Sequence, residues 1–309
     1  MQAPSPGINL TSALLLLALA FVWGGSFFFA EIALAEVPPL TVTLHRVIWS
    51  VPVLLLVLRL RGLKLPASLR AWACYLVMGA LNNAIPFSLI FWGQSTIGSG
   101  LASILNSTTA FFGVIVAGLL LADERLTPAR LVGSLFGVFG VAAIMGLDAL
   151  TDFDPRNLAQ IAILGAALSY AFAAVWGKRF LAEHPPLVNA SGMLVGSAIL
   201  MLPVAGLVDG LPTLALSTGV WVSLLALALL STALAYLLYF EILARAGSAN
   251  LMLVTLLIPP IAVTLAITFL DEQLAQGALL GFALIAIGLL VIDGRLLKLV
   301  SGRKRSNEG

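Results

Sequence analysis

The sequence predicts an all-α integral membrane protein with ten transmembrane helices. Of its 309 residues, 61% are hydrophobic and only 10% are charged, and the mean hydropathy is +1.08, whereas an average soluble domain is about 25% charged. The charges fall between apolar runs of about 20 residues, the length that crosses a bilayer. These runs lack the strict alternation of a membrane β-barrel. The composition therefore excludes an ordinary soluble globule.

Ten helices result when the chain is cut where charges, proline or glycine interrupt the apolar runs. The expected spans are 12–32, 40–59, 71–92, 99–121, 128–147, 158–178, 187–207, 217–240, 248–270 and 275–294. The first span ends near Ala33-Leu34-Ala35, which resembles a signal-peptidase site. No Lys or Arg precedes this run, however, and it is long enough to span a bilayer, so we interpret it as an uncleaved helix.

Basic residues gather in the loops that follow the even-numbered spans and in the C-terminal tail. Fourteen of the 16 Lys and Arg lie there, against only Arg156 in the opposite loops. Cytoplasmic loops of membrane proteins carry such an excess of positive charge. We therefore expect both termini in the cytoplasm and a multi-pass protein of the bacterial inner membrane.

The second half of the chain repeats the first. A shift of 148 residues aligns Asp123-Glu124 with Asp271-Glu272 and matches three glycines in each half without a gap. Each unit contains five spans, and because five is odd, the second unit must enter the membrane from the opposite side. The expected divisions are a first five-helix repeat at 1–147, a periplasmic connecting loop at 148–155, a second, inverted five-helix repeat at 156–295 and a basic cytoplasmic tail at 296–309.

Several classes of function are disfavoured by the residues present. The single cysteine, Cys74, excludes an internal disulfide, and two histidines without a cysteine partner predict neither a metal site nor a cofactor. The sequence has no basic patch with interleaved aromatic residues, so it does not predict nucleic-acid binding. The sequence shows neither a clustered nucleophile nor paired carboxylates, so it does not predict an enzyme. The expected partners are a small-molecule substrate and the lipid bilayer, with the chain acting as a monomer or weak dimer.

Polar and aromatic side chains in mid-span are the candidate substrate contacts, because a polar group in lipid must find a partner or face water. An amide can bind either end of a zwitterion, and tyrosine combines an apolar ring with a polar tip. Ordinary interhelical hydrogen bonds are the alternative role for these side chains. The candidates are Trp23, Asn82, Asn83, Phe87, Asn106, Thr109, Tyr170, Thr232, Tyr236 and Tyr239.

Three candidates of the eighth span are spaced four and three residues apart, so Thr232, Tyr236 and Tyr239 are expected to share one helix face. Tyr239 has an alternative place in the interfacial aromatic belt. Trp23 lies beside Gly24 in mid-span, where a helix can flex or admit a ligand.

His45 and Arg46 lie only five or six residues inside the second span, close to its outer end. A central Arg costs about 2.5 to 3.5 kcal/mol on insertion scales, so it needs a partner. Arg46 is expected to pair with Glu31 or Glu36 as an outer gate or structural pair, or to attract a carboxylate substrate. We favour the structural pair.

Several of these residues together resemble the pattern of a known protein family. Trp23-Gly24, Arg46, the Asp-Glu-x-Leu sequences after spans four and nine and the glycine-rich spans five and ten resemble the drug/metabolite transporter superfamily, in its ten-helix EamA-type branch. The resemblance implies two inverted five-helix repeats around a central cavity. Within the branch, the chain is most similar to bacterial exporters of amino acids, including aromatic ones.

Prolines mark the expected helix breaks, at Pro86 in span three and at Pro259 and Pro260 in span nine. Family members commonly carry a proline in the middle of span four, but here that position reads Asn-Ser-Thr-Thr. A symmetrical pair of breaks is therefore not expected.

The resulting functional hypothesis is the export of amino acids, aromatic or otherwise neutral, and of related small metabolites by alternating access. No Asp or Glu lies in the middle of a span, and tight proton coupling usually needs such a group. We therefore expect facilitated diffusion. The alternatives are a multidrug or lipophilic-cation exporter and an integral membrane enzyme.

Overall fold

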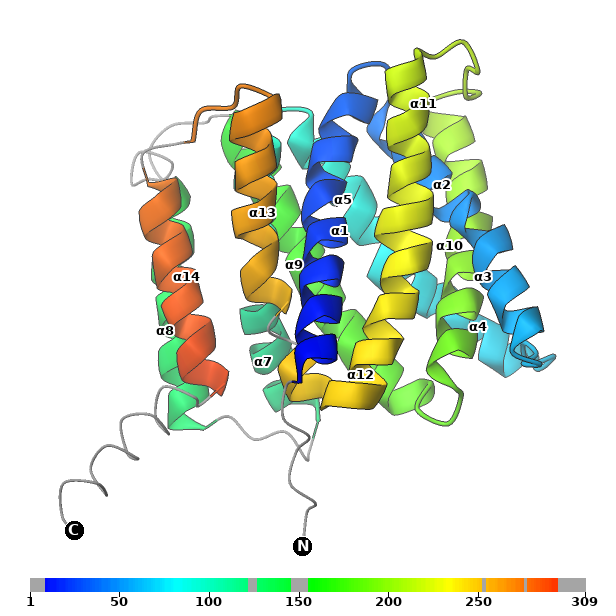
Figure 1. Ribbon diagram of the computed structural model, residues 1–309, viewed down its shortest axis with the longest axis horizontal. Helices are drawn as coiled ribbons and strands as arrows, with labels where there is room; N and C mark the ends of the chain where they lie inside the picture. Colours follow the sequence, from blue (N-terminus) through cyan, green and yellow to red (C-terminus); the bar gives the residue numbers. More distant parts are fainter. Residues whose placement is uncertain (1–8, 122–126, 146–154, 252–253, 275–276, 294–309) are drawn as a thin grey trace, which may run out of the picture.

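The structure is a computed structural model that describes residues 9–121, 127–145, 155–251, 254–274 and 277–293. These residues form an all-helical membrane protein (Figure 1). The first half contains α1 (Leu10–Leu34), α2 (Pro39–Ile48), α3 (Ser50–Leu60), α4 (Leu69–Gly79), the π-helical segment η1 (Ala80–Ala84), α5 (Ile85–Gln94), α6 (Ser99–Asn106), α7 (Thr109–Leu120) and α8 (Pro128–Met145). The second half contains α9 (Pro155–Phe180), α10 (Pro186–Val208), α11 (Thr218–Leu225), the π-helical segment η3 (Ala226–Leu234), α12 (Ala235–Leu251), α13 (Val254–Phe269) and α14 (Ala278–Asp293).

Seven helices of the described part are long and apolar enough to cross a membrane, when consecutive segments such as α2 and α3 are counted as one. The last two predicted spans correspond to the shorter apolar helices α13 and α14. Large apolar side chains, among them Leu17, Phe139 and Leu279, are exposed on the outside of the bundle. Such a surface suits contact with lipid rather than water.

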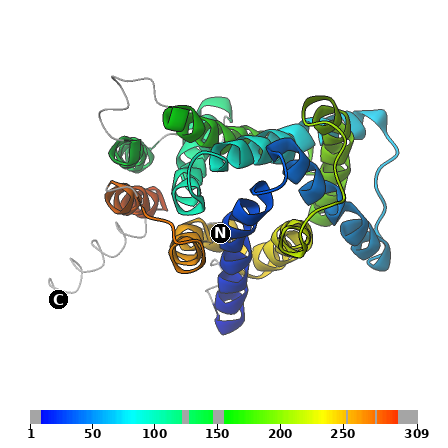
Figure 2. The same ribbon diagram turned by 90° about the horizontal axis from the view of Figure 1, so that it is seen from above.

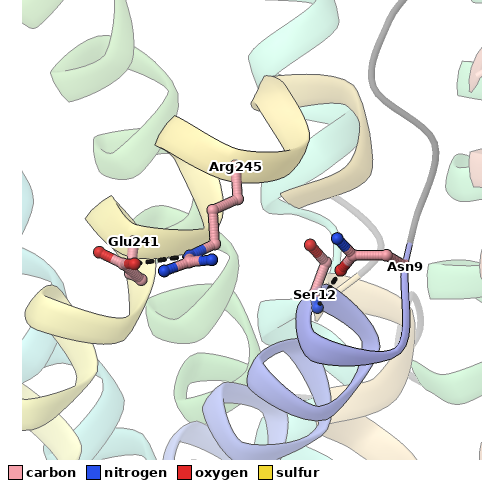
Figure 3. A network of polar contacts seen from close by, with 4 residues as sticks. All are labelled: Asn9, Ser12, Glu241 and Arg245. Atoms are coloured by element: carbon pink, nitrogen blue, oxygen red, sulfur yellow. Dashed lines mark hydrogen bonds and ion pairs between the residues drawn. The ribbon is translucent and has the colours of Figure 1, made fainter.

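The eighth span is longer than predicted. The sequence predicts its end at residue 240, before the first charges, but α12 continues to Leu251. Glu241 and Arg245 are one helical turn apart and form an exposed ion pair, with 2.6 Å between the Arg245 Nε and the Glu241 Oε1 (Figure 3). Because these charges satisfy one another on the helix surface, they do not end the helix. Figure 3 also shows the start of α1, where the Asn9 side chain accepts a hydrogen bond from the Ser12 N–H as an N-cap.

Carboxylates join the two halves at the face opposite the start of α1. Asp209, which follows α10, accepts hydrogen bonds from the Thr41 N–H and hydroxyl at the start of α2. Glu36 accepts from the Ser217 N–H, at the start of α11. Each carboxylate therefore caps a helix of the other half, where the N–H groups lack partners within the helix and the helix dipole favours negative charge.

Glycines let α8 and α14 pack closely, side by side at one end of the molecule (Figure 2). A Cβ placed on Gly288 would lie 2.5 Å from the Gly133 carbonyl oxygen, and one placed on Gly140 would lie 2.8 Å from the Gly281 carbonyl oxygen. The backbones can approach in this way only where no side chain intervenes. The repeated glycines Gly133, Gly140, Gly281 and Gly288 therefore serve helix packing, and the third repeated pair, Gly146 and Gly294, lies outside the described residues.

The two π-helical segments occupy matching places in the two halves. Under the 148-residue shift, η1 (Ala80–Ala84) falls inside η3 (Ala226–Leu234). Pro86 follows η1 and has no N–H to bond the carbonyl four residues earlier, which favours a local widening of the helix. In η3 the Thr232 hydroxyl donates to the Leu227 carbonyl, five residues back. π-Helical turns free backbone groups, and the candidate site forms around these two segments.

Candidate substrate-binding site

The guanidinium of Arg46 lies buried between the two halves. It projects from α2 and is only 7% exposed. Its Nε donates to the Thr232 hydroxyl at 3.0 Å, and its Nη2 donates to the Ser231 carbonyl at 3.3 Å. The guanidinium carbon lies 3.9 Å from the centre of the Phe87 ring and 5.8 Å from that of Phe91. Phe87 and Phe91 therefore stabilise the charge by cation–π contact.

No carboxylate of the described residues forms an ion pair with Arg46. Neither Glu31 nor Glu36 pairs with it: the Glu31 carboxylate accepts from the Gln94 amide, and Glu36 from Ser217. An arginine has five N–H donors, and the described hydrogen bonds use two of them. The site therefore holds an unpaired positive charge with donors to spare.

A network of amides and hydroxyls lies beside this charge. The Asn82 amide donates to the Tyr236 hydroxyl at 3.0 Å, and that hydroxyl donates to the Asn83 Oδ1 at 3.2 Å. The Asn83 amide donates to the Ser197 hydroxyl at 2.9 Å. Asn83 and Ser197 are fully buried. The structure thus brings three of the predicted residues together across the two halves.

A row of aromatic rings leads from α1 to this network. The rings of Trp23 and Tyr239 have centroids 6.1 Å apart, Tyr239 and Phe240 are 5.3 Å apart, and Phe240 and Tyr236 are 6.3 Å apart. Thr232, Tyr236 and Tyr239 do not meet at one point, because Thr232 contacts Arg46, Tyr236 contacts the asparagines and Tyr239 contacts Trp23. The π-helical turns of η3 end between Thr232 and Tyr236, so the spacing of a regular α-helix does not hold there.

Tyr170 belongs to the core that surrounds the candidate site, but no described hydrogen bond links it to Arg46 or to the asparagines. It lies on α9 and packs against the same core as Phe87 and Tyr236. The neighbouring Ser169 donates to the Leu81 carbonyl of η1 at 2.7 Å, which holds α9 against this segment.

Asn106 and Thr109 lie at an interruption of the fourth span, where α6 ends and α7 begins. The hydroxyls of Ser107, Thr108 and Thr109 each donate to the carbonyl three residues earlier, as at 2.7 Å from Thr109 to Asn106. The Asn106 Oδ1 is buried and has no hydrogen-bond partner. No described hydrogen bond links these residues to Arg46 or to the asparagine network.

The prolines act differently from one another. Pro86 lies in the first turn of α5, directly after the π-helical segment. Pro259 and Pro260, in contrast, lie inside α13, which continues through them without a break. The fourth span has no proline at its centre and is nevertheless interrupted, at the point where its consecutive hydroxyl side chains donate to the backbone three residues earlier.

His45 is adjacent to Arg46 in the chain, but its side chain makes contacts in a different part of the structure. Its Nδ1 accepts from the Trp49 indole N–H at 2.9 Å. It lines a hollow of about 140 Å³ with Glu36, Thr41 and Asp209, between the start of α2 and the end of α10. Hydrogen bonds from the Ser217 hydroxyl and N–H hold the pKa of the Glu36 carboxyl below its ordinary value.

The residues missed in the sequence are small or apolar. Ser197 completes the asparagine network, Phe91 flanks the guanidinium, and the Met193 sulfur accepts from Asn82 at 3.7 Å. A signal for one further residue was present in the repeat: the 148-residue shift places Ser231 opposite Asn83, and both bond the other half.

Both halves of the chain match one known family. Residues 10–146 and 157–293 each correspond to the EamA-like transporter family. The chain belongs to that family. It is therefore a duplicated transporter of the drug/metabolite transporter group, a multi-pass membrane protein with a small-molecule substrate and not a member of an enzyme family.

Several known proteins are similar to this chain over most of its length. The "Uncharacterized transporter YoaV" of Bacillus subtilis is 25% identical over 89% of this chain and 94% of its own. The "Probable amino-acid metabolite efflux pump" of Escherichia coli is 28% identical over 90% of this chain and 93% of its own. The "Probable terminal-alkyne amino-acid exporter" of Streptantibioticus cattleyicolor is 28% identical over 74% of this chain and 73% of its own.

A solved crystal structure has the same fold. It covers 92% of this chain and 96% of its own with a TM-score of 0.65, at 19% sequence identity. The arrangement of EamA-family helices described above therefore matches an experimental structure.

Proposed function

We propose that this EamA-family protein exports amino acids, aromatic or otherwise neutral, and related small metabolites across the bacterial inner membrane by alternating access. Two kinds of observation support the proposal. The chemistry of the candidate site suits a zwitterion with an apolar side chain, and similar proteins carry names that refer to amino-acid export.

The unpaired guanidinium of Arg46 is the observation that carries the proposal. A buried cation without a counter-charge is costly, and Phe87 and Thr232 offset only part of that cost. The carboxylate of an amino acid would supply the missing charge, and a guanidinium binds a carboxylate with two parallel hydrogen bonds. The same charge disfavours the rival substrate class, lipophilic cations.

The surroundings of Arg46 suit the rest of an amino acid. The amide oxygens of Asn82 and Asn83 can accept hydrogen bonds from an ammonium group. The aromatic row from Trp23 to Tyr236 offers apolar faces for a ring or an aliphatic chain. Each end of the substrate would thus meet matching chemistry.

Alternating access would follow from the internal duplication. We propose that the repeats divide at 1–147 and 156–295, that they are inverted because each has five spans, and that both termini are cytoplasmic because the basic loops lie on that side. Arg46 and Thr232 come from different halves, so a rocking motion of one half against the other would change the site.

We propose that the transport is facilitated diffusion. Within the described spans, Glu31 and Asp293 lie near helix ends, whereas Glu241 lies inside α12, contrary to the sequence expectation, and forms an exposed ion pair with Arg245. None of the three forms a described hydrogen bond with the asparagine network. Without a titratable carboxyl group at the substrate, transport would run down the substrate gradient.

The test is the uptake of radiolabelled phenylalanine into proteoliposomes that contain the purified full-length protein. Alanine and a lipophilic cation serve as competitors, with and without a pH gradient. We expect saturable flux that alanine reduces, that the cation does not reduce and that the gradient leaves unchanged. Competition by the cation alone would favour a multidrug or lipophilic-cation exporter. Flux that follows the pH gradient would contradict facilitated diffusion.

A further inference from the structure

The hollow beside His45 is large enough to hold a small organic molecule. It lies between the start of α2 and the end of α10, and its volume of about 140 Å³ is about ten times what one ordered water needs. Glu36 and Leu211, which line it, are exposed, so the hollow opens to the outside of the bundle. Val37 and Pro38 add apolar walls. The space therefore suits a ligand with both polar and apolar parts.

Two carboxylates give the hollow its charge. The Asp209 Oδ2 accepts from the Thr41 N–H at 2.8 Å and from the Thr41 hydroxyl at 2.9 Å, whereas the Asp209 Oδ1 has no described hydrogen bond. The Glu36 Oε2 accepts from the Ser217 N–H at 2.8 Å. Among the described residues, no Lys or Arg lines the hollow. The positive group of a ligand is therefore favoured there, with the Asp209 Oδ1 as a free acceptor.

His45 adds a hydrogen-bond donor to the lining. The residue is only 6% exposed, and its Nδ1 accepts from the Trp49 indole N–H at 2.9 Å. A neutral imidazole whose Nδ1 accepts a hydrogen bond carries its proton at Nε2. The Nε2 is buried and has no hydrogen-bond partner in the part of the chain that the structure describes. A buried N–H without an acceptor costs free energy, so this position lacks an accepting group.

The donor and the acceptors meet along one face of α2. Thr41 and His45 are four residues apart, so they share a helix face, and both line the hollow. Trp49 follows four residues later and holds the Nδ1 edge of the imidazole. The Nε2 edge is thereby left on the side of Thr41 and of the Asp209 carboxylate that Thr41 binds.

We propose that the hollow is a second binding site, for a small zwitterion with one ammonium and one carboxylate group, such as alanine. The ammonium group binds the Asp209 Oδ1 beside Glu36, and the carboxylate accepts from the His45 Nε2–H. An amine without a carboxylate leaves the His45 donor unpaired, and a carboxylate without an ammonium group is repelled by the two acidic side chains. A zwitterion satisfies both ends of the site.

The site lies next to the buried guanidinium along α2, because Arg46 directly follows His45. Arg46 contacts Thr232 and the aromatic rings, whereas His45 contacts Trp49 and lines the hollow. Transfer of the carboxylate from the Arg46 guanidinium to the His45 N–H would move a substrate from the buried site toward the outside of the bundle. That the zwitterion is in transit rests on the proposed function, whereas its binding in the hollow does not.

The experiment titrates the full-length protein in lipid nanodiscs with L-alanine and records tryptophan fluorescence. Trp49 donates to His45, and the ring centroid of Trp221 lies 5.6 Å from that of His45, so both indoles report on the hollow. Ethylamine and propionate are the matched probes, since they are alanine without its carboxylate and without its ammonium group. We expect a saturable change with alanine and at least about tenfold weaker binding of either probe, because each lacks one charge-assisted hydrogen bond.

Two variants test the residues of the site. His45→Phe removes the donor but keeps an aromatic ring, and Asp209→Asn removes the charge but keeps an acceptor for α2. Each should weaken alanine binding at least about tenfold, and Asp209→Asn serves alone if His45→Phe does not fold. Glu272→Gln is the matched control: Glu272 also caps a helix of the other half, accepting from the Ser99 N–H at 2.8 Å, but it does not line the hollow. Its affinity for alanine should equal that of wild type.

Arg46→Gln provides a background in which the buried site is weakened. In this background the remaining response to alanine should still depend on His45 and Asp209. The proposal is overturned if wild type shows no saturable response, if ethylamine binds as tightly as alanine, or if the response survives both His45→Phe and Asp209→Asn. No readout uses transport, so a protein that binds alanine in the hollow without transporting it refutes only the proposed function. Transport without binding in the hollow refutes only this site.

Discussion

Asn83 and Ser231 occupy equivalent places in the two halves and bond in opposite directions across their interface. They are 148 residues apart, one in η1 and the other in η3. The Asn83 amide of the first half donates to the Ser197 hydroxyl of the second at 2.9 Å, and the Ser231 hydroxyl donates to the Val22 carbonyl of the first half at 3.0 Å. The two π-helical segments therefore form reciprocal links, and a change at one should be felt in the opposite half.

Gly79→Ala should destabilise the protein by about 1–3 kcal/mol, the usual cost of overpacking. A Cβ at Gly79 would lie 2.6 Å from the Met193 carbonyl oxygen and 2.7 Å from the Ser197 nitrogen, both backbone atoms of α10. Gly113→Ala is the control, because no atom lies within 4 Å of a Cβ there, and it should be neutral or stabilising. Reversible unfolding in detergent micelles measures both, and equal stabilities would refute the close packing of α4 on α10.

Tyr236→Phe should reduce the free energy of unfolding by about 1 kcal/mol, since interhelical hydrogen bonds in membranes are worth roughly 0.6 kcal/mol each. The hydroxyl takes part in two of them, with Asn82 and Asn83. Tyr239→Phe removes a hydroxyl for which the described structure gives no hydrogen bond, so it should cost less. The same unfolding assay compares them, and a larger loss for Tyr239→Phe would contradict the network.

Arg46→Gln should lower phenylalanine flux at least tenfold, because the substrate carboxylate loses a charged partner worth at least about 1.5 kcal/mol. Arg46→Lys keeps the charge but not the planar pair of donors, so its flux should be intermediate. The flux of phenylalaninol, which lacks the carboxylate, should differ much less between wild type and Arg46→Gln. If both substrates lose flux equally, Arg46 has a structural role instead.

Asn83→Ala and Trp23→Ala should also reduce flux while the protein still inserts into the membrane. Asn83 offers the amide oxygen that Tyr236 now occupies, and Trp23 begins the aromatic row. Membrane insertion is checked by the yield of folded protein after purification. Wild-type rates in both variants would remove these residues from the site.

The cap that Glu36 provides should weaken in acid. Its pKa is lowered by hydrogen bonds from Ser217, so the ionised form stabilises the folded state above the unfolded pKa of about 4.3. This contribution is lost as the pH falls through the lower folded pKa. The unfolding midpoints of wild type and Glu36→Gln should therefore differ at pH 6 and converge near pH 3. A difference that persists in acid would contradict the expected loss of stability on protonation of Glu36.

Sequence periodicity and the apolar runs predict the helices well, because a bilayer requires continuous backbone hydrogen bonding over a fixed length. Exceptions occur where a few side chains decide the backbone. The fourth span is interrupted at Ser107 and Thr108, whose hydroxyls donate to the backbone, while α13 passes through Pro259 and Pro260. Neither result follows from residue type alone.

The candidate site was harder to predict than the fold. Asn82, Asn83 and Tyr236 were identified because polar groups at depth are rare, and the structure brings them together. The partners of Arg46 could not be predicted, since Thr232 and Phe87 are distant in sequence and a cation–π contact leaves no pattern in the chain. Whether these residues bind substrate stays a prediction.

The exchange of caps between the halves bears on how such a protein could be divided. Asp209, Glu36 and Glu272 each complete a helix that belongs to the other half. A half that is translated alone would leave the N–H groups of Thr41, Ser99 and Ser217, at the starts of α2, α6 and α11, without these acceptors. Two separately encoded halves should therefore be unstable singly and should assemble when co-expressed, each acting as a folding template for the other.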